Sequence, residues 1–483
     1  MNRRWMLGCG LAAVCGLGQA QPFETPPQPG APRALAIAVP TEATLANGLR
    51  VVVAPRRDLP LVTAHLLLLS GSEADPPQCA GLAAMTAALL TKGTKRHDAP
   101  ALARAAEALG GSLDSGAGWN QSRVSISVTT PMLPAALALV GEAVMQPVFA
   151  QAELDRLRAQ SLDEMKLSLS QPGTLATLAA DRLLFSGTPY GHLASGTPAS
   201  LPRISRADVQ ALHRREHRPD RAVLVLAGDI DLATGQALAQ QVFGAWRAAP
   251  SASASPSAAA PAIVAAASGA SRLAIDLGDS GQAAVVVALP LPARTAMSST
   301  DAAVAQVTNA VIGGGYSSRL MQEIRIKRGL SYGADSALDR RRDASLWLAS
   351  VQTKHESAAE VLGLVHAELD RLIATPVPDD ELAARKATLI GGFSRSVETT
   401  GALAAQVSGL VVAGEPTDRL RSRIAELSAV TPAQVQDFAS RYFVVAQRRS
   451  VVAGKAADFA AALKAQDAGW SVIPQSALDL DAR

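Results

Sequence analysis

The sequence predicts an α+β fold in two tandem homologous halves, each an antiparallel-rich mixed sheet with helices packed on its face. Two internal matches indicate the duplication: SRADVQAL at 205–212 resembles TPAQVQDF at 431–438, and VLAG at 225–228 resembles VVAG at 451–454. Both matches have the same spacing along the chain, which is far too long for a solenoid repeat and is typical of a duplicated domain. An alanine-, serine- and proline-rich stretch at 248–270 has the composition of a flexible linker between the two halves.

Within the first half, apolar β-branched runs alternate with helical patterns. The runs at 49–54 and 61–70 are joined by a short polar segment, so they predict a hairpin-like pair of strands. The helix predicted at 99–109 ends at Gly110, a residue that stops helices readily. The other elements expected in this half are a helix at 80–90, strands at 112–114 and 123–129, and helices at 131–144 and 152–168.

Length and composition exclude several classes of function. A chain of 483 residues is too long for one ordinary core, and a hydrophobic content of 48% indicates a folded protein of two or more domains. The aromatic content of 4% gives little support to stacking on nucleic-acid bases. The 45 basic and 42 acidic residues form no basic block, so neither DNA nor an anionic membrane is implied as a partner.

The N-terminus has the pattern of a secretory signal peptide. Arg3 and Arg4 precede an apolar run at 5–17, and the small-residue segment that ends at Ala20 offers a cleavage site. The run is too short to be a good membrane span. The prediction is export to the periplasm after cleavage. Lipidation of Cys15 is the alternative, although the residues before this cysteine make a poor lipobox.

The expected organisation follows from these boundaries. It comprises a signal peptide at 1–20, a proline-rich extended tail at 21–43, a first half at 44–247, the linker at 248–270 and a second half at 271–475. Removal of the signal peptide leaves one cysteine, Cys79, which excludes an intramolecular disulfide. Stability must then come from a large core, which a chain of this length can supply.

Two segments have the most specific patterns in the chain: GLAAMTAALLTKGT at 81–94, and GGGYSSRLMQEIRIKRGLSY at 313–332. The first resembles the zinc helix of the pitrilysin/insulinase family of zinc peptidases, G-x-A-H-x-x-E-H-x-x-x-K-G-T. The second resembles the signature of the second half in the same family, which includes the mitochondrial processing peptidases. The resemblance covers nearly all of 44–455. It implies two homologous halves that close like a clamshell around a cavity.

The zinc helix lacks the residues that would hold zinc. A zinc peptidase of this type needs two histidines one helical turn apart and a glutamate beside them that activates the zinc-bound water. Ala84, Ala87 and Ala88 stand at those three positions. Glu164 matches the family's third ligand, but one carboxylate cannot hold a catalytic zinc, and we interpret it as a solvated or helix-pairing residue. No metal site or other cofactor is therefore predicted in this chain.

A second string, HRREH at 213–217, has the literal spacing of a zinc signature. It lies at the C-terminal end of a predicted helix, with Pro219 two residues beyond it, and arginines occupy both intervening positions. No glutamate lies near position 294, where the family spacing would place a third ligand. We interpret His213 and His217 as surface residues that favour a helix C-terminus.

The resemblance assigns a substrate grip to the second half. In the family, an arginine and a tyrosine seven residues later hold the substrate backbone, and Arg325 and Tyr332 match them. A phenol can stabilise the oxyanion that forms during peptide hydrolysis, and a guanidinium can hold a neighbouring carbonyl. The run Gly313, Gly314 and Gly315 matches a glycine-rich loop that contacts substrate in the non-catalytic subunit of mitochondrial processing peptidase. The alternatives are a salt-bridged arginine and a core tyrosine.

Three functions remain open from the sequence. The first is a non-catalytic, substrate-binding subunit that forms a heterodimer with a homologous zinc-bearing peptidase subunit and supplies Arg325 and Tyr332 to it. The second is an autonomous metallopeptidase with an atypical site such as His213 and His217. The third is a non-enzymatic peptide-binding or scaffold protein, like the core proteins of the respiratory cytochrome bc complex. The retained arginine and tyrosine favour the first over the third, and the three alanines disfavour the second.

Overall fold

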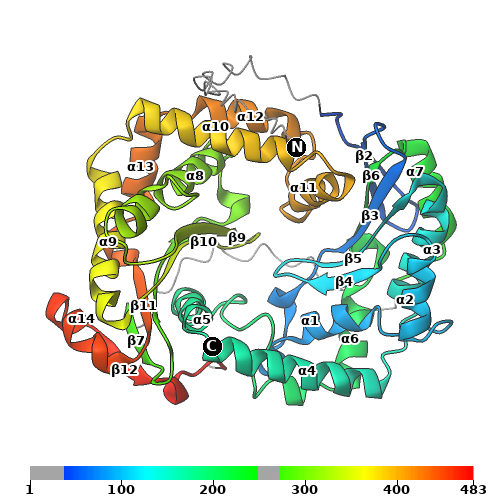
Figure 1. Ribbon diagram of the computed structural model, residues 1–483. Coiled ribbons are helices and arrows are strands. Elements are labelled where there is room, and N and C mark those ends of the chain that lie inside the picture. Colours follow the sequence, from blue (N-terminus) through cyan, green and yellow to red (C-terminus); the bar gives the residue numbers. More distant parts are fainter. Residues whose placement is uncertain (1–36, 249–270, 482–483) are drawn as a thin grey trace, which may run out of the picture. The chain divides into compact units, whose positions relative to one another are not determined.

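The computed structural model describes residues 37–248 and 271–481. The predicted signal peptide, most of the proline-rich tail and nearly all of the predicted linker lie outside the described residues. The described chain forms two mixed sheets with helices on their faces, one sheet in each half (Figure 1). This confirms the α+β class and the organisation in two halves.

The first half contains a six-stranded sheet in its described part. In spatial order its strands are β1 (Thr41–Thr44), β2 (Arg50–Pro55), β6 (Ala222–Gly228), β3 (Leu61–Leu68), β5 (Ser122–Thr129) and β4 (Asp114–Ala117). Only the β2–β6 pair is parallel among these neighbours, so the sheet is rich in antiparallel pairs as expected.

The predicted hairpin of the first two long strands is wrong. Strand β6 lies between β2 and β3, pairing in parallel with β2 and antiparallel with β3. All seven residues of β6 are buried, which is what its continuous apolar sequence requires at the centre of a covered sheet. The short connection between β2 and β3 therefore spans the width of an inserted strand, and a strand far away in sequence completes the pairing.

The second half repeats this sheet with one change at its edge. Its strands in spatial order are β12 (Ser471–Pro474), β7 (Arg272–Asp276), β11 (Arg449–Gly454), β8 (Ala283–Leu291), β10 (Ser345–Thr353) and β9 (Ala334–Arg340). Strand β11 is parallel to β7 and antiparallel to β8, as β6 is to β2 and β3. At the edge, β12 is parallel to β7, whereas β1 is antiparallel to β2.

Local details support the duplication that the internal matches predicted. The helix before β6 begins with a capping box from Ser205, and the helix before β11 begins with a capping box from Thr431. Strands β6 and β11 end at Gly228 and Gly454, whose φ angles of 138° and 152° are rarely available to other residues. The two halves thus repeat the same sequence of cap, helix, strand and glycine.

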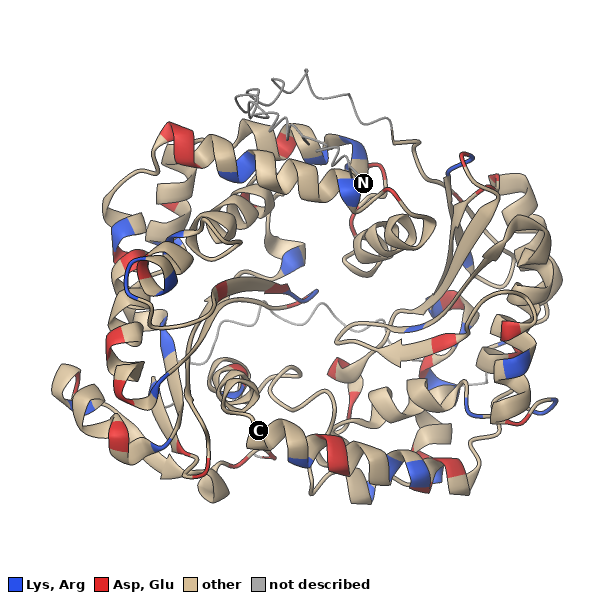
Figure 2. Ribbon diagram, in the orientation of Figure 1, with Lys and Arg blue, Asp and Glu red and all other residues tan. Residues whose placement is uncertain are grey.

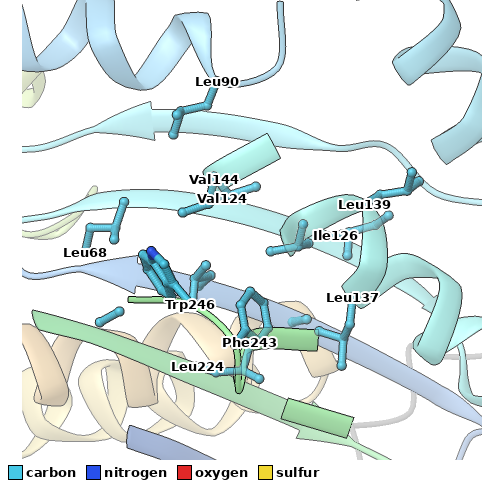
Figure 3. Close-up of a cluster of buried hydrophobic side chains, with 14 of the residues drawn as sticks. Leu68, Leu90, Val124, Ile126, Leu137, Leu139, Val144, Leu224, Phe243 and Trp246 are labelled. Atoms are coloured by element: carbon cyan, nitrogen blue, oxygen red, sulfur yellow. The ribbon is translucent and has the colours of Figure 1, made fainter. Parts of the chain in front are cut away.

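Helices cover both sheets. In the first half they are α1 (Leu82–Leu89), α2 (Ala99–Glu107), α3 (Leu133–Met145), α4 (Gln151–Ser170), α5 (Pro172–Phe185), α6 (Arg206–Glu216) and α7 (Leu232–Phe243). In the second they are α8 (Ser299–Ile312), α9 (Ala358–Ala374), α10 (Asp379–Arg395), α11 (Thr400–Val412), α12 (Arg419–Ala429), α13 (Pro432–Tyr442) and α14 (Ala460–Gln466). Figure 3 shows how side chains such as Phe243 and Trp246 fill the first core between sheet and helices. No helix in the described ranges is long and apolar enough to cross a membrane.

The two halves exchange one helix each. Helix α5 of the first half packs on β8 and β11 of the second sheet, and Leu175 and Phe185 lie in one apolar cluster with Val286 and Val451. Helix α11 of the second half packs in turn on β3 and β6 of the first sheet. His65 on β3 contacts the Ser408 hydroxyl of α11 across 3.0 Å. Each half therefore completes the core of the other, which ties them together by buried apolar surface.

Candidate functional site

Helix α1 contains the three alanines at the zinc positions. Ala87 is fully buried, whereas Ala84 and Ala88 lie one turn apart on a half-buried face. The helix packs against β4, α4 and α6. Methyl groups cannot coordinate a metal ion, so the residues present on α1 do not fit zinc.

A buried carboxylate holds the start of α1. Asp75 accepts hydrogen bonds from the backbone N–H groups of Gly81 and Ala83, at 2.9 and 2.8 Å. The His192 Nε2 atom lies 3.6 Å from the same carboxylate, and the ring of Trp119 packs edge-on against His192. Burial raises the pKa of Asp75 despite these contacts. Asp75 thus acts as a helix cap from a distant position, a role that the sequence pattern did not reveal.

Glu164 is exposed on α4. Its Oε1 atom accepts a hydrogen bond from the Gln160 side chain at 2.8 Å, the spacing of one helical turn. This is the solvated, helix-pairing role expected for it. Across the described ranges, no group of three or more His, Cys, Asp or Glu side chains is placed to hold a metal ion.

His213 and His217 of the HRREH string are not surface residues, so that interpretation is wrong. His217 is buried, and His213 is half-buried and donates from Nε2 to the carbonyl oxygen of Val144 at 2.7 Å. The two rings pack edge to face with centroids 4.7 Å apart, and burial lowers the pKa of both. Glu216 pairs with Arg215 and Arg221. The two histidines at the C-terminal end of α6 therefore pack inward, whereas Arg214 and Arg215 between them are exposed.

The glycine run brings the end of α8 against β9. The N–H group of Ser336 donates to the carbonyl oxygen of Gly313 at 3.2 Å, and a Cβ atom on Gly313 would lie 2.5 Å from that nitrogen. A Cβ atom on Gly314 would lie 2.6 Å from the Cα atom of Ala310. Gly315 has open space around it but a φ angle of 140°. The three glycines therefore permit a tight turn that leads into the segment with Arg325.

Arg325 and Tyr332 are both available to a ligand. Arg325 lies in a π-helical turn (Met321–Ile326), and its guanidinium stacks over the ring of Tyr316 at 5.3 Å. It forms no ion pair with any described residue. Tyr332 is 94% exposed. Neither alternative role fits, because Arg325 is not salt-bridged and Tyr332 is not in the core. Among the described residues, no hydrogen bond, ion pair or ring contact joins the two side chains to each other or to α1.

The backbone beside Tyr332 is firmly anchored. The Ser331 hydroxyl lies 2.6 Å from the carbonyl oxygens of both Gly333 and Gln352, and the Thr353 hydroxyl donates to the carbonyl oxygen of Leu330 at 2.6 Å. These contacts tie the loop to the end of β10. The backbone position of Tyr332 is therefore fixed, while its exposed phenol is left free of partners among the described residues.

A buried arginine joins the halves and was not identified from the sequence. Arg341, in the turn after β9, is 3% exposed and donates from Nη2 to both carboxylate oxygens of Asp181 on α5, at 2.7 and 2.9 Å. Its guanidinium lies 4.4 Å from the ring centre of Trp119 and 4.7 Å from that of Phe185. The available signal in the sequence was the run of three arginines at 340–342, but their spacing does not indicate which residues they pair with.

The sequence of this chain matches two family models and resembles several known proteins. The model of the insulinase family, peptidase family M16, matches residues 50–192, and the model described as the peptidase M16 inactive domain matches residues 203–389. A protein of Mycobacterium tuberculosis described as an uncharacterized zinc protease is 28% identical over 78% of this chain and 83% of its own length. A Helicobacter pylori protein described as a non-peptidase homolog, YmxG, is 24% identical over 79% of this chain and 86% of its own.

Solved structures share the same fold. The crystal structure of a peptidase M16 inactive domain from Pseudomonas fluorescens superposes with a TM-score of 0.76 and 26% identity, covering 86% of this chain and 98% of that one. A protease from Helicobacter pylori superposes with a TM-score of 0.80 and 18% identity, covering 87% of this chain and all of that one.

Proposed function

This chain belongs to the insulinase family of peptidases, family M16, and we propose that it is a non-catalytic, substrate-binding subunit of a heteromeric bacterial zinc peptidase. Its partner would be a homologous subunit that carries an intact zinc helix. This chain would supply Arg325 and Tyr332 to the peptide while the partner supplies the metal. The chain alone would then have no peptidase activity.

The observation that carries the proposal is the exposure of the Tyr332 side chain. Full exposure of a tyrosine gives up the burial that usually stabilises an aromatic side chain, and its hydroxyl has no partner among the described residues. Arg325, in the π-helical turn that precedes it in the chain, forms no ion pair among the described residues, although guanidinium groups pair readily. Two such side chains, one of them on an anchored loop, support a role toward a molecule outside the chain.

The chemistry expected of the pair is electrostatic. When water attacks a peptide bond, negative charge develops on the carbonyl oxygen, and a phenol positioned at that oxygen stabilises the transition state. The guanidinium of Arg325 can hold a second backbone carbonyl, which fixes the peptide for attack. Strand β9 begins two residues after Tyr332 and is the edge strand of its sheet, so an extended peptide can add alongside it.

The second candidate is a non-enzymatic peptide-binding or scaffold protein of the same fold. The similarity to a relative described as a non-peptidase homolog favours this alternative. An autonomous metallopeptidase that uses His213 and His217 is less well supported. Both rings lie within the packed end of α6, and the Nε2 atom of His213 already serves a backbone carbonyl.

The test is reconstitution with a zinc-bearing homologue from the same organism. Wild-type chain should raise peptide hydrolysis by that homologue, and Arg325→Ala and Tyr332→Phe should each lower the rate of the mixture. Loss of one oxyanion donor typically costs about 10²–10³ in rate. Arg104→Ala, at an exposed α2 position, and Tyr442→Phe, at a half-buried position on α13, serve as matched controls. If both grip variants support full activity with unchanged thermal unfolding, the scaffold function becomes the better account.

A further inference from the structure

A cavity of about 280 Å³ lies at the C-terminal end of β9. The turn after β9, the β4–β5 turn of the first half and the end of α11 line it, so both halves contribute to its wall. Figure 2 shows basic positions at this end of β9. The basic residues that line the cavity are Arg123, Arg294, Arg340, Arg341 and Arg342, and Asp339 is the acidic residue among the described lining residues.

Two of these arginines have acidic partners of their own, and one has none. Arg341 is neutralised by Asp181, as described above. Arg342 pairs with Asp343 at 2.9 Å, and with Glu73 at 3.6 Å. Arg123 is exposed and forms no ion pair within the described chain, so it presents a free guanidinium at the cavity.

The remaining arginines share one carboxylate. Glu415 accepts a hydrogen bond from Arg294 Nε at 2.7 Å, pairs with Arg419, and lies 3.9 Å from Arg340 Nη2. Arg419 also pairs with Glu426 at 3.4 Å. Burial, followed by repulsion from Arg294, lowers the pKa of Arg340 to about 10, although Glu415 opposes this shift. Positive charge is therefore in excess around Arg340.

Buried guanidinium donors at the cavity lack acceptors. The Nε and Nη2 atoms of Arg340 and the Nη1 atom of Arg341 are buried and make no hydrogen bond to any described residue. An unsatisfied buried donor is costly, more so when it is charged. A carboxylate is the acceptor whose geometry best matches adjacent guanidinium N–H groups, because both of its oxygens can accept in parallel.

We propose that this cavity binds a carboxylate of an extended peptide, through Arg340 and Arg123, and so selects acidic peptides as ligands. The inference rests on the proposed function, because it requires that the chain bind peptide. The carboxylate is either an acidic side chain or the α-carboxylate of a peptide C-terminus. A cavity of this volume accommodates one such group.

The geometry also predicts where the acid lies in the peptide. Tyr332 and Arg340 stand at opposite ends of β9, and about eight residues of extended chain span roughly 26 Å. A peptide lying along β9 would thus place its carboxylate about eight residues from the residue that Tyr332 contacts. This spacing distinguishes binding in the cavity from general attraction to a basic protein, which has no preferred position.

The experiment measures binding of fluorescent peptides to the purified full chain by anisotropy. One glutamate is moved along an otherwise neutral 16-residue peptide, with glutamine at the same position as the control. Each peptide is made with a free and with an amidated C-terminus, which separates side-chain from terminal recognition. We expect roughly tenfold or more tightening at one or two neighbouring positions. Arg123→Gln and Arg340→Gln should remove that gain, and Arg104→Gln should keep it.

Every outcome of the binding experiment either supports or overturns the carboxylate site. Arg123 is exposed and forms no ion pair with the residues that the structure describes, so its variant tests the cavity even if Arg340→Gln unfolds. Equal affinity for glutamate and glutamine peptides, an equal gain at every position, or retention of the preference in Arg123→Gln would overturn the carboxylate site. Neutral peptides that bind and respond to Arg325→Ala would leave the proposed function intact in that case. If no peptide binds and the chain does not stimulate the zinc-bearing homologue, both the carboxylate site and the proposed function fail.

Discussion

Replacing Arg341 by methionine tests whether this buried guanidinium holds the two halves together. Methionine keeps most of the length and apolar volume of the side chain but removes its charge. The Asp181 carboxylate on α5 then loses both charge-assisted hydrogen bonds, at 2.7 and 2.9 Å, while it stays largely buried. The guanidinium stacking on Trp119 and Phe185 is lost as well.

The expected cost in the free energy of unfolding follows from burial. Breaking a buried ion pair from one side typically costs about 3–5 kcal/mol, because the remaining charge is left uncompensated. Asp181 retains 21% side-chain exposure, and Arg341 also pairs with the half-exposed Asp339, so we expect about 3 kcal/mol. Arg441→Met is a matched control. Arg441 also pairs with two aspartates and stacks on a tyrosine, but it is 41% exposed and should cost about 1 kcal/mol or less.

Urea unfolding of wild type, both single variants and Arg341→Met/Asp181→Asn at pH 7 provides the measurement. The double variant should recover most of the loss, because it removes the stranded charge. Burial raises the pKa of Asp181, and loss of Arg341 raises it further. The single variant should therefore regain stability relative to wild type as pH is lowered from 7, because protonation removes the stranded charge. The reasoning would be refuted if Arg341→Met/Asp181→Asn were no more stable than Arg341→Met. It would also be refuted if Arg341→Met lost no more stability than Arg441→Met.

Two further predictions concern Glu73 and the zinc face. Burial raises the pKa of Glu73 to about 7 from 4.5, so its contribution to stability is full below pH 4.5 and is lost as pH rises through 7. Glu73→Gln should reduce this pH-dependent loss in the free energy of unfolding by up to about 3 kcal/mol between about pH 4.5 and 7.5, as measured by urea unfolding. A variant with the same pH dependence as wild type would contradict the prediction. Ala84→His with Ala88→His should bind zinc at least weakly by calorimetry, and adding Glu164→Ala should weaken binding. Parent-like zinc affinity in a folded double variant would show that this face or Glu164 is misassigned.

The repeated architecture was predictable because it depends on local patterns. Apolar strands, capped helices and the repeated spacing each leave a signature in neighbouring residues, and the fold reproduces them. The pairing of β2 was not predictable in the same way. Its partner β6 lies more than 160 residues further along the chain, and the short link to β3 suggested a hairpin instead. Non-local pairing is set by which strands bury both faces, which local periodicity does not report.

Side-chain environments were predicted unevenly from the sequence. Arg325 and Tyr332 were identified by their motif, and the exposure of Tyr332 agrees with the role assigned to it. His213 and His217 were misjudged because a polar helix end suggests solvent, whereas neighbouring elements cover this one. The helix exchange between the halves leaves no local pattern, so Arg341 and its partner Asp181 could not be paired from the sequence.

The packing of α1 accommodates alanine at the positions that match the zinc site. Ala87 is fully buried in the packed helix. A glutamate at this position would bury a carboxylate, and without a metal ion to balance it that charge would be costly. Alanine is therefore the stable choice on a helix that holds no zinc, and it carries no penalty for the fold. Arg325 and Tyr332 are in the opposite situation, because neither side chain supports a core or an ion pair in the described chain. Apart from the stacking of Arg325 on Tyr316, the described chain gives these two side chains no structural partner, which is the reason for proposing that they contact a peptide.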